Sequence, residues 1–159
     1  MRLVGLYHSA RGAHTFFLRA KEVQRPGSYL VNLIHYEDAA SLAVAVLAGD
    51  GAGAGGHRAA TFLGCDGSPV TFADMMDATV RSGRFEGEVT FLGEDEPQTG
   101  KRADNAWTRA QLGGWEPKYP SFSSFMVDGK GVDVYVEDAG LASLGLKHGE
   151  GSVPKSHKS

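Results

Sequence analysis

The sequence contains a single cysteine, Cys65, among its 159 residues. One thiol forms neither an internal disulfide nor a cysteine-based zinc site, so we expect an apolar core to hold the fold in a reducing compartment. No apolar run reaches the roughly 18 residues of a membrane span, because charged residues interrupt each one first. We therefore predict a soluble intracellular protein without a membrane partner. Its compartment is left open between the cytoplasm and an organelle, plastids included.

The sequence also has no excess of basic residues over acidic ones. The 16 Lys and Arg residues against 19 Asp and Glu residues give a formal net charge of -3 at pH 7. Such a charge offers no positive field to a phosphate backbone, which excludes nucleic acid as a partner. The six histidines show no paired ligand spacing and no HExxH motif occurs, so we predict no metal site. Cys65 has no catalytic-thiol signature around it and is interpreted as structural.

Glycine, by contrast, is abundant, at 22 of 159 residues, which indicates many tight turns between short elements. Strands alternate with helices along the sequence, which predicts an α/β chain with parallel strand pairing. The helix opened by Glu37 and Asp38 is almost wholly apolar and is expected to be buried. Periodicity and turn signals place strands at residues 3–7, 31–35, 59–63 and 89–92, helices at 39–47, 71–82 and 105–112, and a short helix or irregular segment at 16–22.

Two stretches fall outside this alternation. Residues 50–56 contain GxGxxG, but that nucleotide-binding pattern needs a strand before it and a helix after it, and here the order is reversed. We interpret them as a flexible connector. From Val127 onward large apolar residues become scarce, so residues 1–126 are predicted to form the folded portion and 127–159 a poorly ordered extension.

Two polar clusters are candidates for a site on residue type alone. The polar residues from Asn32 to Asp38 surround the start of the predicted buried helix, where they either cap the helix or line a site. Lys101 and Arg102 precede the helix of residues 105–112. They either clamp a phosphate or carboxylate group or form a solvated basic pair.

Three segments carry a resemblance to one known family. They are Arg2-Leu3-Val4-Gly5-Leu6-Tyr7 with Arg11-Gly12, the run from Val31 to Ala40, and the run from Lys101 through Leu112-Gly113-Gly114-Trp115-Glu116-Pro117-Lys118-Tyr119-Pro120-Ser121-Phe122. Over about residues 2–126, the chain resembles the C-terminal half of an extended or atypical short-chain dehydrogenase/reductase of the NAD-dependent epimerase/dehydratase type. The third segment is the most specific, since that family closes with a basic pair, Asn, a short helix, Leu-Gly-Trp, Pro, Tyr-Pro and Phe.

The resemblance implies the C-terminal part of a Rossmann-like NAD(P)-binding domain, with a small mixed α+β substrate lobe. It further implies that NAD or NADP lies beside the end of the first strand and that a small-molecule substrate lies next to it. The implied cofactor-binding residues are Tyr7, His8 and Ser9, and the implied substrate-binding residues are Arg11, Asn32, His35, Lys101 and Arg102.

The sequence also departs from the family pattern. His8-Ser9-Ala10 replaces the usual Gly-Pro-Gly, and one extra glycine stands in Leu112-Gly113-Gly114-Trp115. The family's glycine-rich phosphate turn in its first strand-helix unit is missing, and so is its Tyr-x-x-x-Lys pair. Without that pair the hydride chemistry has no acid or base, so no catalytic residue is predicted in this chain.

These observations lead to two expectations of function. The first is an NAD(P)-dependent epimerase, dehydratase or reductase-like protein for a nucleotide-sugar-like or other small carbonyl substrate, present as an incomplete and inactive chain. The alternative is a non-catalytic module that binds a small molecule or is completed by a partner chain supplying the missing half. A homo-oligomer is left open.

Overall fold

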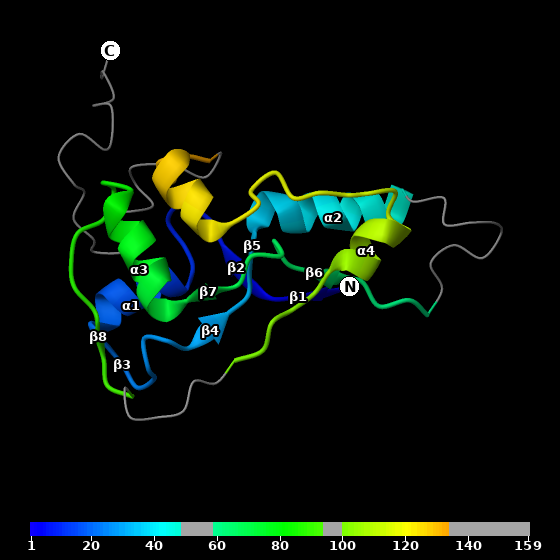
Figure 1. Cartoon of the computed structure of the whole chain (residues 1–159). Helices are drawn as coiled ribbons and strands as arrows, with labels where there is room; N and C mark the ends of the chain where they lie inside the picture. Colours follow the sequence, from blue (N-terminus) through cyan, green and yellow to red (C-terminus); the bar gives the residue numbers. More distant parts are fainter. Residues whose placement is uncertain (49–58, 94–99, 134–159) are drawn as a thin grey trace, which may run out of the picture.

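A computed structural model of the chain describes residues 1–48, 59–93 and 100–133 (Figure 1). Two strands of the N-terminal segment, β1 and β2, each pair with a strand from later in the chain. β6 lies parallel to β1, with Arg2 opposite Leu63, and β5 lies parallel to β2, with Tyr7 opposite His35. The Asp66 amide donates to the Leu33 carbonyl at 2.9 Å, which joins the end of β6 to β5. The bounds are β1 (Arg2–Leu3), β2 (Gly5–Tyr7), β5 (Leu33–His35) and β6 (Leu63–Gly64).

Two further strand pairs complete the described strands. β3 (Glu22–Val23) pairs in parallel with β8 (Thr90–Phe91), and β4 (Leu30–Val31) pairs antiparallel with β7 (Val70–Thr71). Three of the four pairs in the described ranges are therefore parallel. The α/β class with parallel pairing is confirmed, whereas the antiparallel pair was not predicted.

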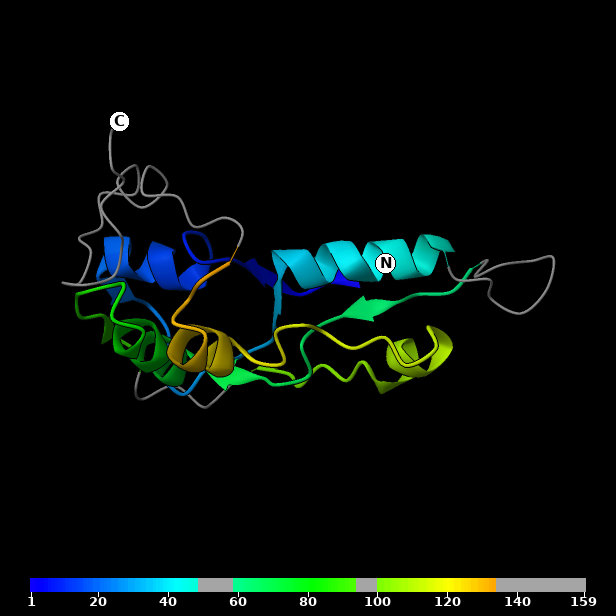
Figure 2. The ribbon, with the colours of Figure 1, turned by 90° about the horizontal axis from the view of Figure 1, so that it is seen from above.

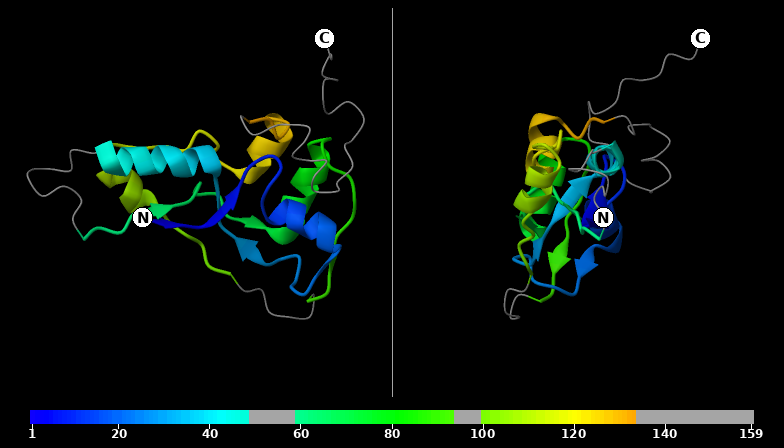
Figure 3. Two further views of the ribbon diagram at one scale, coloured as in Figure 1. Left: turned by 180° about the vertical axis from the view of Figure 1, so that it is seen from behind. Right: turned by 90° about the vertical axis from the view of Figure 1, so that its right-hand side faces the viewer.

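The helices divide the molecule into two ends. Figures 1 and 2 show α2 and α4 at one end and α1, α3, β3 and β8 at the other. Seen from behind in Figure 3, β1 and β2 run along α2 toward the end that holds α1 and α3. None of the described helices is long and apolar enough to cross a membrane. The bounds are α1 (Ala13–Ala20), α2 (Tyr36–Ala48), α3 (Phe72–Arg81), α4 (Ala106–Gln111) and a π-helical turn, η1 (Ser124–Asp128).

Local sequence explains where α3 begins. Thr71 is its N-cap, and the Thr71 hydroxyl accepts a hydrogen bond from the Asp74 amide at 3.1 Å. The Thr71 hydroxyl also donates to the Asp74 carboxylate at 2.7 Å. This reciprocal pair closes the first turn and stabilises the helix start, as the sequence predicts.

The prediction that α2 is buried is wrong for one of its faces. Leu42 is fully buried, whereas Val44 is 64% exposed and Leu47 is 86% exposed. Gly64 lies under the buried face, where an added Cβ would stand 2.6 Å from Leu42 Cδ2. An almost uniformly apolar, alanine-rich sequence carries little directional signal, so composition could not identify the exposed face.

The main core lies between α1, α3, η1 and the ends of β2 and β5. The predicted start of the extension, Val127, falls inside η1, and the chain is described to Asp133. The predictions for residues 50–56 and 134–159 lie outside the described residues. Core members from these elements and from the residues just before η1 are Tyr7, Phe17, Leu18, Leu33, Met75, Met76, Ala78, Phe122, Phe125 and Met126.

Candidate functional site

The carboxyl ends of β2 and β5 bring four predicted site residues together. Tyr7 and His35 are register partners, and their ring centroids are 5.2 Å apart. His8 and Ser9 follow Tyr7 directly, and the His8 ring lies 5.2 Å from that of Tyr36. Parallel strands end at the same edge of a sheet, which is why residues far apart in sequence meet here.

The loop after β2 is a tight turn. The backbones of His8 and Arg11 bridge each other, with N···O distances of 2.9 and 3.2 Å. Within the turn, the Ala10 amide donates to His8 Nδ1 at 3.2 Å. Gly12 closes the turn with φ 149°, and a Cβ there would stand 3.0 Å from Tyr7 Cβ. The turn leaves Arg11 exposed at its end.

Asp133 holds this loop against β5. Its carboxylate accepts hydrogen bonds from the Ser9 amide at 2.8 Å and the Ser9 hydroxyl at 3.0 Å. It also lies 2.8 Å from His35 Nε2, and both side chains are fully buried. Because the Glu37 amide donates to His35 Nδ1 at 3.1 Å, the imidazole hydrogen lies on Nε2 and is donated to Asp133.

The Ser9, His35 and Asp133 arrangement is not a nucleophilic triad. In such a triad the serine hydroxyl donates to the histidine, and the histidine is oriented by the carboxylate. Here the Ser9 hydroxyl donates to Asp133, which stands between the other two side chains. The arrangement therefore fixes the loop and activates no hydroxyl group.

Tyr7 contributes a buried phenol. Its side chain is fully buried, and Tyr7 Oη has no hydrogen-bond partner among the described residues. Burial, followed by the nearby carboxylates of Asp66 and Asp38, raises the pKa of Tyr7 above its usual value. The phenol therefore stays protonated.

The first turn of α2 binds a distant segment. The Asp38 carboxylate accepts hydrogen bonds from the backbone amides of Lys118 at 2.7 Å and Tyr119 at 3.0 Å. Glu37 binds the Lys118 ammonium at 2.8 Å and the Tyr119 hydroxyl at 3.1 Å. Burial raises the pKa of Asp38, although the two amide hydrogen bonds act against it. The Tyr119 ring is thereby held 4.1 Å from that of His35.

The remaining predicted residues form a second group. Asn32 Nδ2 donates to the Lys101 carbonyl at 2.6 Å, and the Ala103 amide donates to Asn32 Oδ1 at 2.8 Å. Asn32 therefore fixes the backbone around Arg102. The side chains of Lys101 and Arg102 are exposed.

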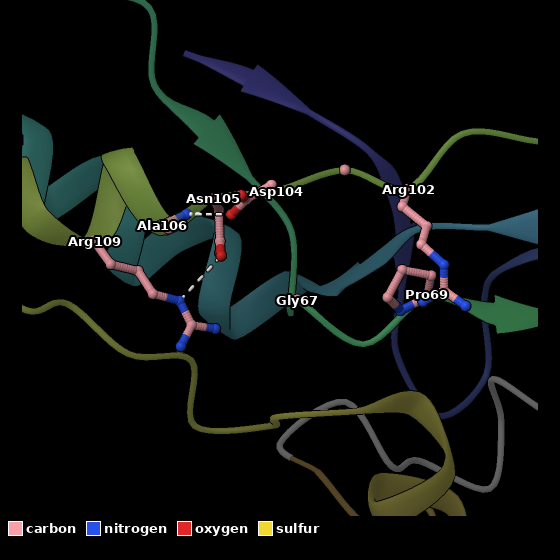
Figure 4. A pocket seen from close by; sticks show the side chains of 8 residues that line it. Gly67, Pro69, Arg102, Asp104, Asn105, Ala106 and Arg109 are labelled. Carbon is pink, nitrogen blue, oxygen red and sulfur yellow. Dashed lines mark hydrogen bonds between the residues drawn. The ribbon is translucent and has the colours of Figure 1, made fainter.

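A cavity of about 350 Å³ lies next to these two basic residues. Arg102 lines the cavity, whereas Lys101 does not. Figure 4 shows Arg109 and Asn105 on one side of Gly67, and Arg102 beside Pro69 on the other. Arg109 Nε donates to Asn105 Oδ1 at 3.0 Å, and Arg109 Nη2 donates to the Asp66 carbonyl at 2.9 Å. The lining residues are Gly67, Pro69, Arg102, Ala103, Asp104, Asn105, Ala106 and Arg109.

Asp66 lies behind the loop that borders this cavity. Its Oδ1 accepts a hydrogen bond from the Ser68 amide at 2.8 Å, and its Oδ2 is buried without a partner in the described part of the chain. Burial raises the pKa of Asp66 to about 7. Burial also raises the pKa of the neighbouring Cys65 thiol, which makes Cys65 a poor nucleophile. No three His, Cys, Asp or Glu side chains in the described ranges are grouped to hold a metal ion.

Sequence reasoning missed Asp133, Asp66 and Arg109. Arg109 had a usable signal, because it stands four residues after Asn105, on the same face of the predicted helix. Asp133 had none, since it lies in the stretch interpreted as an extension. The site assignments themselves remain predictions.

No protein-family model matches the chain, and no curated protein matches its sequence. Among solved structures, it is similar to RMD from Pseudomonas aeruginosa complexed with NADPH, with a TM-score of 0.53 and 15% identity. The match covers 90% of this chain and 46% of that protein, so the chain spans about half the length of its structural neighbour. At this identity the likeness shows a shared fold.

Proposed function

We propose that the chain is the substrate-side part of an NAD(P)-dependent reductase-like protein of the epimerase/dehydratase type. Its substrate would be a nucleotide-sugar-like or other small carbonyl compound. The observation that carries the proposal is the meeting of Tyr7, His8 and Ser9 with His35 at the carboxyl ends of β2 and β5. Ligands of α/β sheets bind at that edge. The fold shared with part of a protein complexed with NADPH supports the same proposal.

The described residues do not make up a complete dinucleotide site. The Ser9 amide and hydroxyl both donate to Asp133, so neither is available to a cofactor. The sequence has no Tyr-x-x-x-Lys pair to hold a ribose or exchange a proton. In this proposal, residues of a further segment, on the same polypeptide or on a partner chain, bind most of the cofactor. No step of hydride transfer is derived from this chain.

The role left to this chain is to border the cofactor and the substrate. His8 is half-buried and Arg11 is exposed on the turn that Asp133 holds in place. Arginine binds phosphate through charge-assisted hydrogen bonds, so Arg11 is suited to the phosphate of a nucleotide-sugar-like substrate. Asp133 binds both the turn, through Ser9, and His35, so the position of the turn is fixed relative to His35.

Titration of the isotope-labelled chain with UDP-glucose, a nucleotide sugar, followed by backbone amide NMR, tests the proposed substrate-side role. We expect shifts confined to residues 8–12, and an affinity about tenfold lower in Arg11→Ala, as the loss of one charge-assisted contact predicts. Arg19→Ala is the matched control, because Arg19 is also exposed but lies in the last turn of α1. No shift at residues 8–12, or an equal effect of both variants, would contradict the proposal.

A non-catalytic small-molecule-binding module is the second candidate function. The cavity lined by Arg102 favours it, as does the absence of the Tyr-x-x-x-Lys pair. Binding of another small molecule to the chain without any response to UDP-glucose at residues 8–12 would select this alternative.

A further inference from the structure

We propose that the cavity between the loop after β6 and the start of α4 binds the phosphate group of a small phosphorylated metabolite, with Arg102 as its ionic partner. This inference does not depend on NAD(P) binding, because every residue it uses belongs to the described part of this chain. The cavity volume of about 350 Å³ is near the lower end of the range for small-molecule pockets. A compound the size of a sugar phosphate fits that volume better than a dinucleotide does.

The charges that line the cavity favour an anion. Arg102 has no hydrogen bond or ion pair within the described ranges, and its side chain lines the cavity. Asp104, the one carboxylate in the lining, already accepts a hydrogen bond from the Ala106 amide at 2.8 Å. The lining therefore holds two guanidinium groups and one carboxylate, and Glu116, which lies outside the lining, pairs with Arg109. Arg102 is the cation left for a phosphate group to pair with.

Arg109 is already oriented for such a ligand. Asn105 Oδ1, the Asp66 carbonyl and the Glu116 carboxylate each accept one of its N–H groups. A guanidinium carries five N–H donors, so two remain for a ligand oxygen or hydroxyl group. Because the side chain is held before any ligand arrives, binding costs little of its conformational entropy.

The backbone that carries both arginines is also fixed. Asn32 binds the Lys101 carbonyl and the Ala103 amide, one on each side of Arg102. The Leu63 amide donates to the Thr108 hydroxyl at 2.9 Å, and Asn105 Nδ2 donates to the Cys65 carbonyl at 2.5 Å, which joins α4 to β6. Binding groups that are mounted on such supports keep their geometry.

Gly67 keeps the cavity open at its centre. Its φ of 86° is unfavourable for other residues, and an added Cβ would stand 3.1 Å from Arg109 Nη2. Gly67→Ala is therefore expected to displace the Arg109 guanidinium as well as to strain the turn. Gly67→Ala therefore tests the contribution of Arg109 to ligand binding, whereas Arg102→Ala tests that of Arg102.

The experiment is calorimetric titration of the full chain with glucose 1-phosphate, inorganic phosphate, glucose and acetate as probes. We expect glucose 1-phosphate to bind and glucose not to bind, with inorganic phosphate weaker than the sugar phosphate. Arg102→Ala is expected to weaken binding about tenfold, as the loss of a charge-assisted contact predicts. Lys101→Ala is the matched control, because that neighbouring cation lies outside the lining.

Circular dichroism of each variant shows whether it is folded, and Arg102 is exposed, so its replacement should not affect folding. Arg102→Lys should restore part of the affinity, because it keeps the charge without the planar fork. Equal losses in Arg102→Ala and Lys101→Ala would overturn the proposal. So would binding of acetate and not of the phosphates, or no binding of any probe by folded wild-type chain. A response to UDP-glucose at residues 8–12 tests the other proposal separately.

Discussion

At the scale of single residues, the Asp38 carboxylate connects α2 to a segment 80 residues further along the chain. Asp38 is 1% exposed, and both of its oxygens accept backbone amides, from Lys118 and Tyr119. Those amides belong to an irregular segment, so a carboxylate on α2 replaces the partners that regular secondary structure would supply.

Asp38→Ala is expected to lower the free energy of unfolding by about 2–4 kcal/mol, because two amides lose a charged acceptor. Urea denaturation measures this difference. Asp77→Ala is the control: Asp77 pairs with Arg81, both side chains are 62% exposed, and such pairs contribute only about 0.3–0.5 kcal/mol. Equal losses in the two variants would show that the Asp38 contacts do not stabilise the chain.

The sequence predicted part of the candidate site at this scale. Tyr7, His8, Ser9 and His35 lie in motifs that carried a family resemblance, and the structure places them at one sheet edge. Asp133 could not be found, because its role arises only from contacts to residues 98 and 124 positions away. Local patterns hold no information on such a pairing.

At the scale of elements, the sequence predicts helices better than strands. Thr71 and the acid three residues later identify the start of α3, which the structure confirms. The strands are only two or three residues long, too short for an alternation to register. The antiparallel pairing of β4 with β7 therefore has no sequence signal, and the strand predicted at residues 59–63 reduces to β6 at Leu63–Gly64.

The two faces of α2 should respond differently to substitution. Leu42→Ala removes a fully buried side chain, and we expect it to cost about 2–5 kcal/mol of unfolding free energy. Leu47→Lys replaces a side chain that is 86% exposed, and we expect a change within about 0.5 kcal/mol. Urea denaturation of both variants checks this. A loss above about 2 kcal/mol in Leu47→Lys would mean that its face of α2 is covered.

At the scale of the whole molecule, two buried groups oppose each other in the response to pH. Burial raises the pKa of Asp66 from 3.8 to about 7 and lowers the pKa of His14 from 6.5 to about 4. Between those values the folded chain keeps a proton on Asp66 that the unfolded chain releases, so stability falls as pH rises. Over the same range the unfolded chain protonates His14 and the folded chain does not, so stability rises with pH.

Each group alone changes the free energy of unfolding by up to about 1.4 kcal/mol per pH unit. The wild-type chain should therefore show a nearly flat stability from about pH 4.5 to 6, measured by urea denaturation. In Asp66→Asn the stability should rise more steeply with pH over that interval than in wild type, because the opposing effect of Asp66 is removed. In His14→Gln it should fall. The same slope in both variants would contradict this assignment of the buried charges.

During synthesis, the loop after β2 cannot make its hydrogen bonds to Asp133 until Asp133 has been added to the chain. Ser9 leaves the ribosome 124 residues before the side chain that holds it. At about 5–20 residues per second, the interval is on the order of 6–25 s. Throughout that time the nascent chain carries Ser9 without its acceptor. His35 lacks the same acceptor while the 98 residues that separate it from Asp133 are added. The turn at residues 8–11 is thus completed only after Asp133, 124 residues further along the chain, has been made.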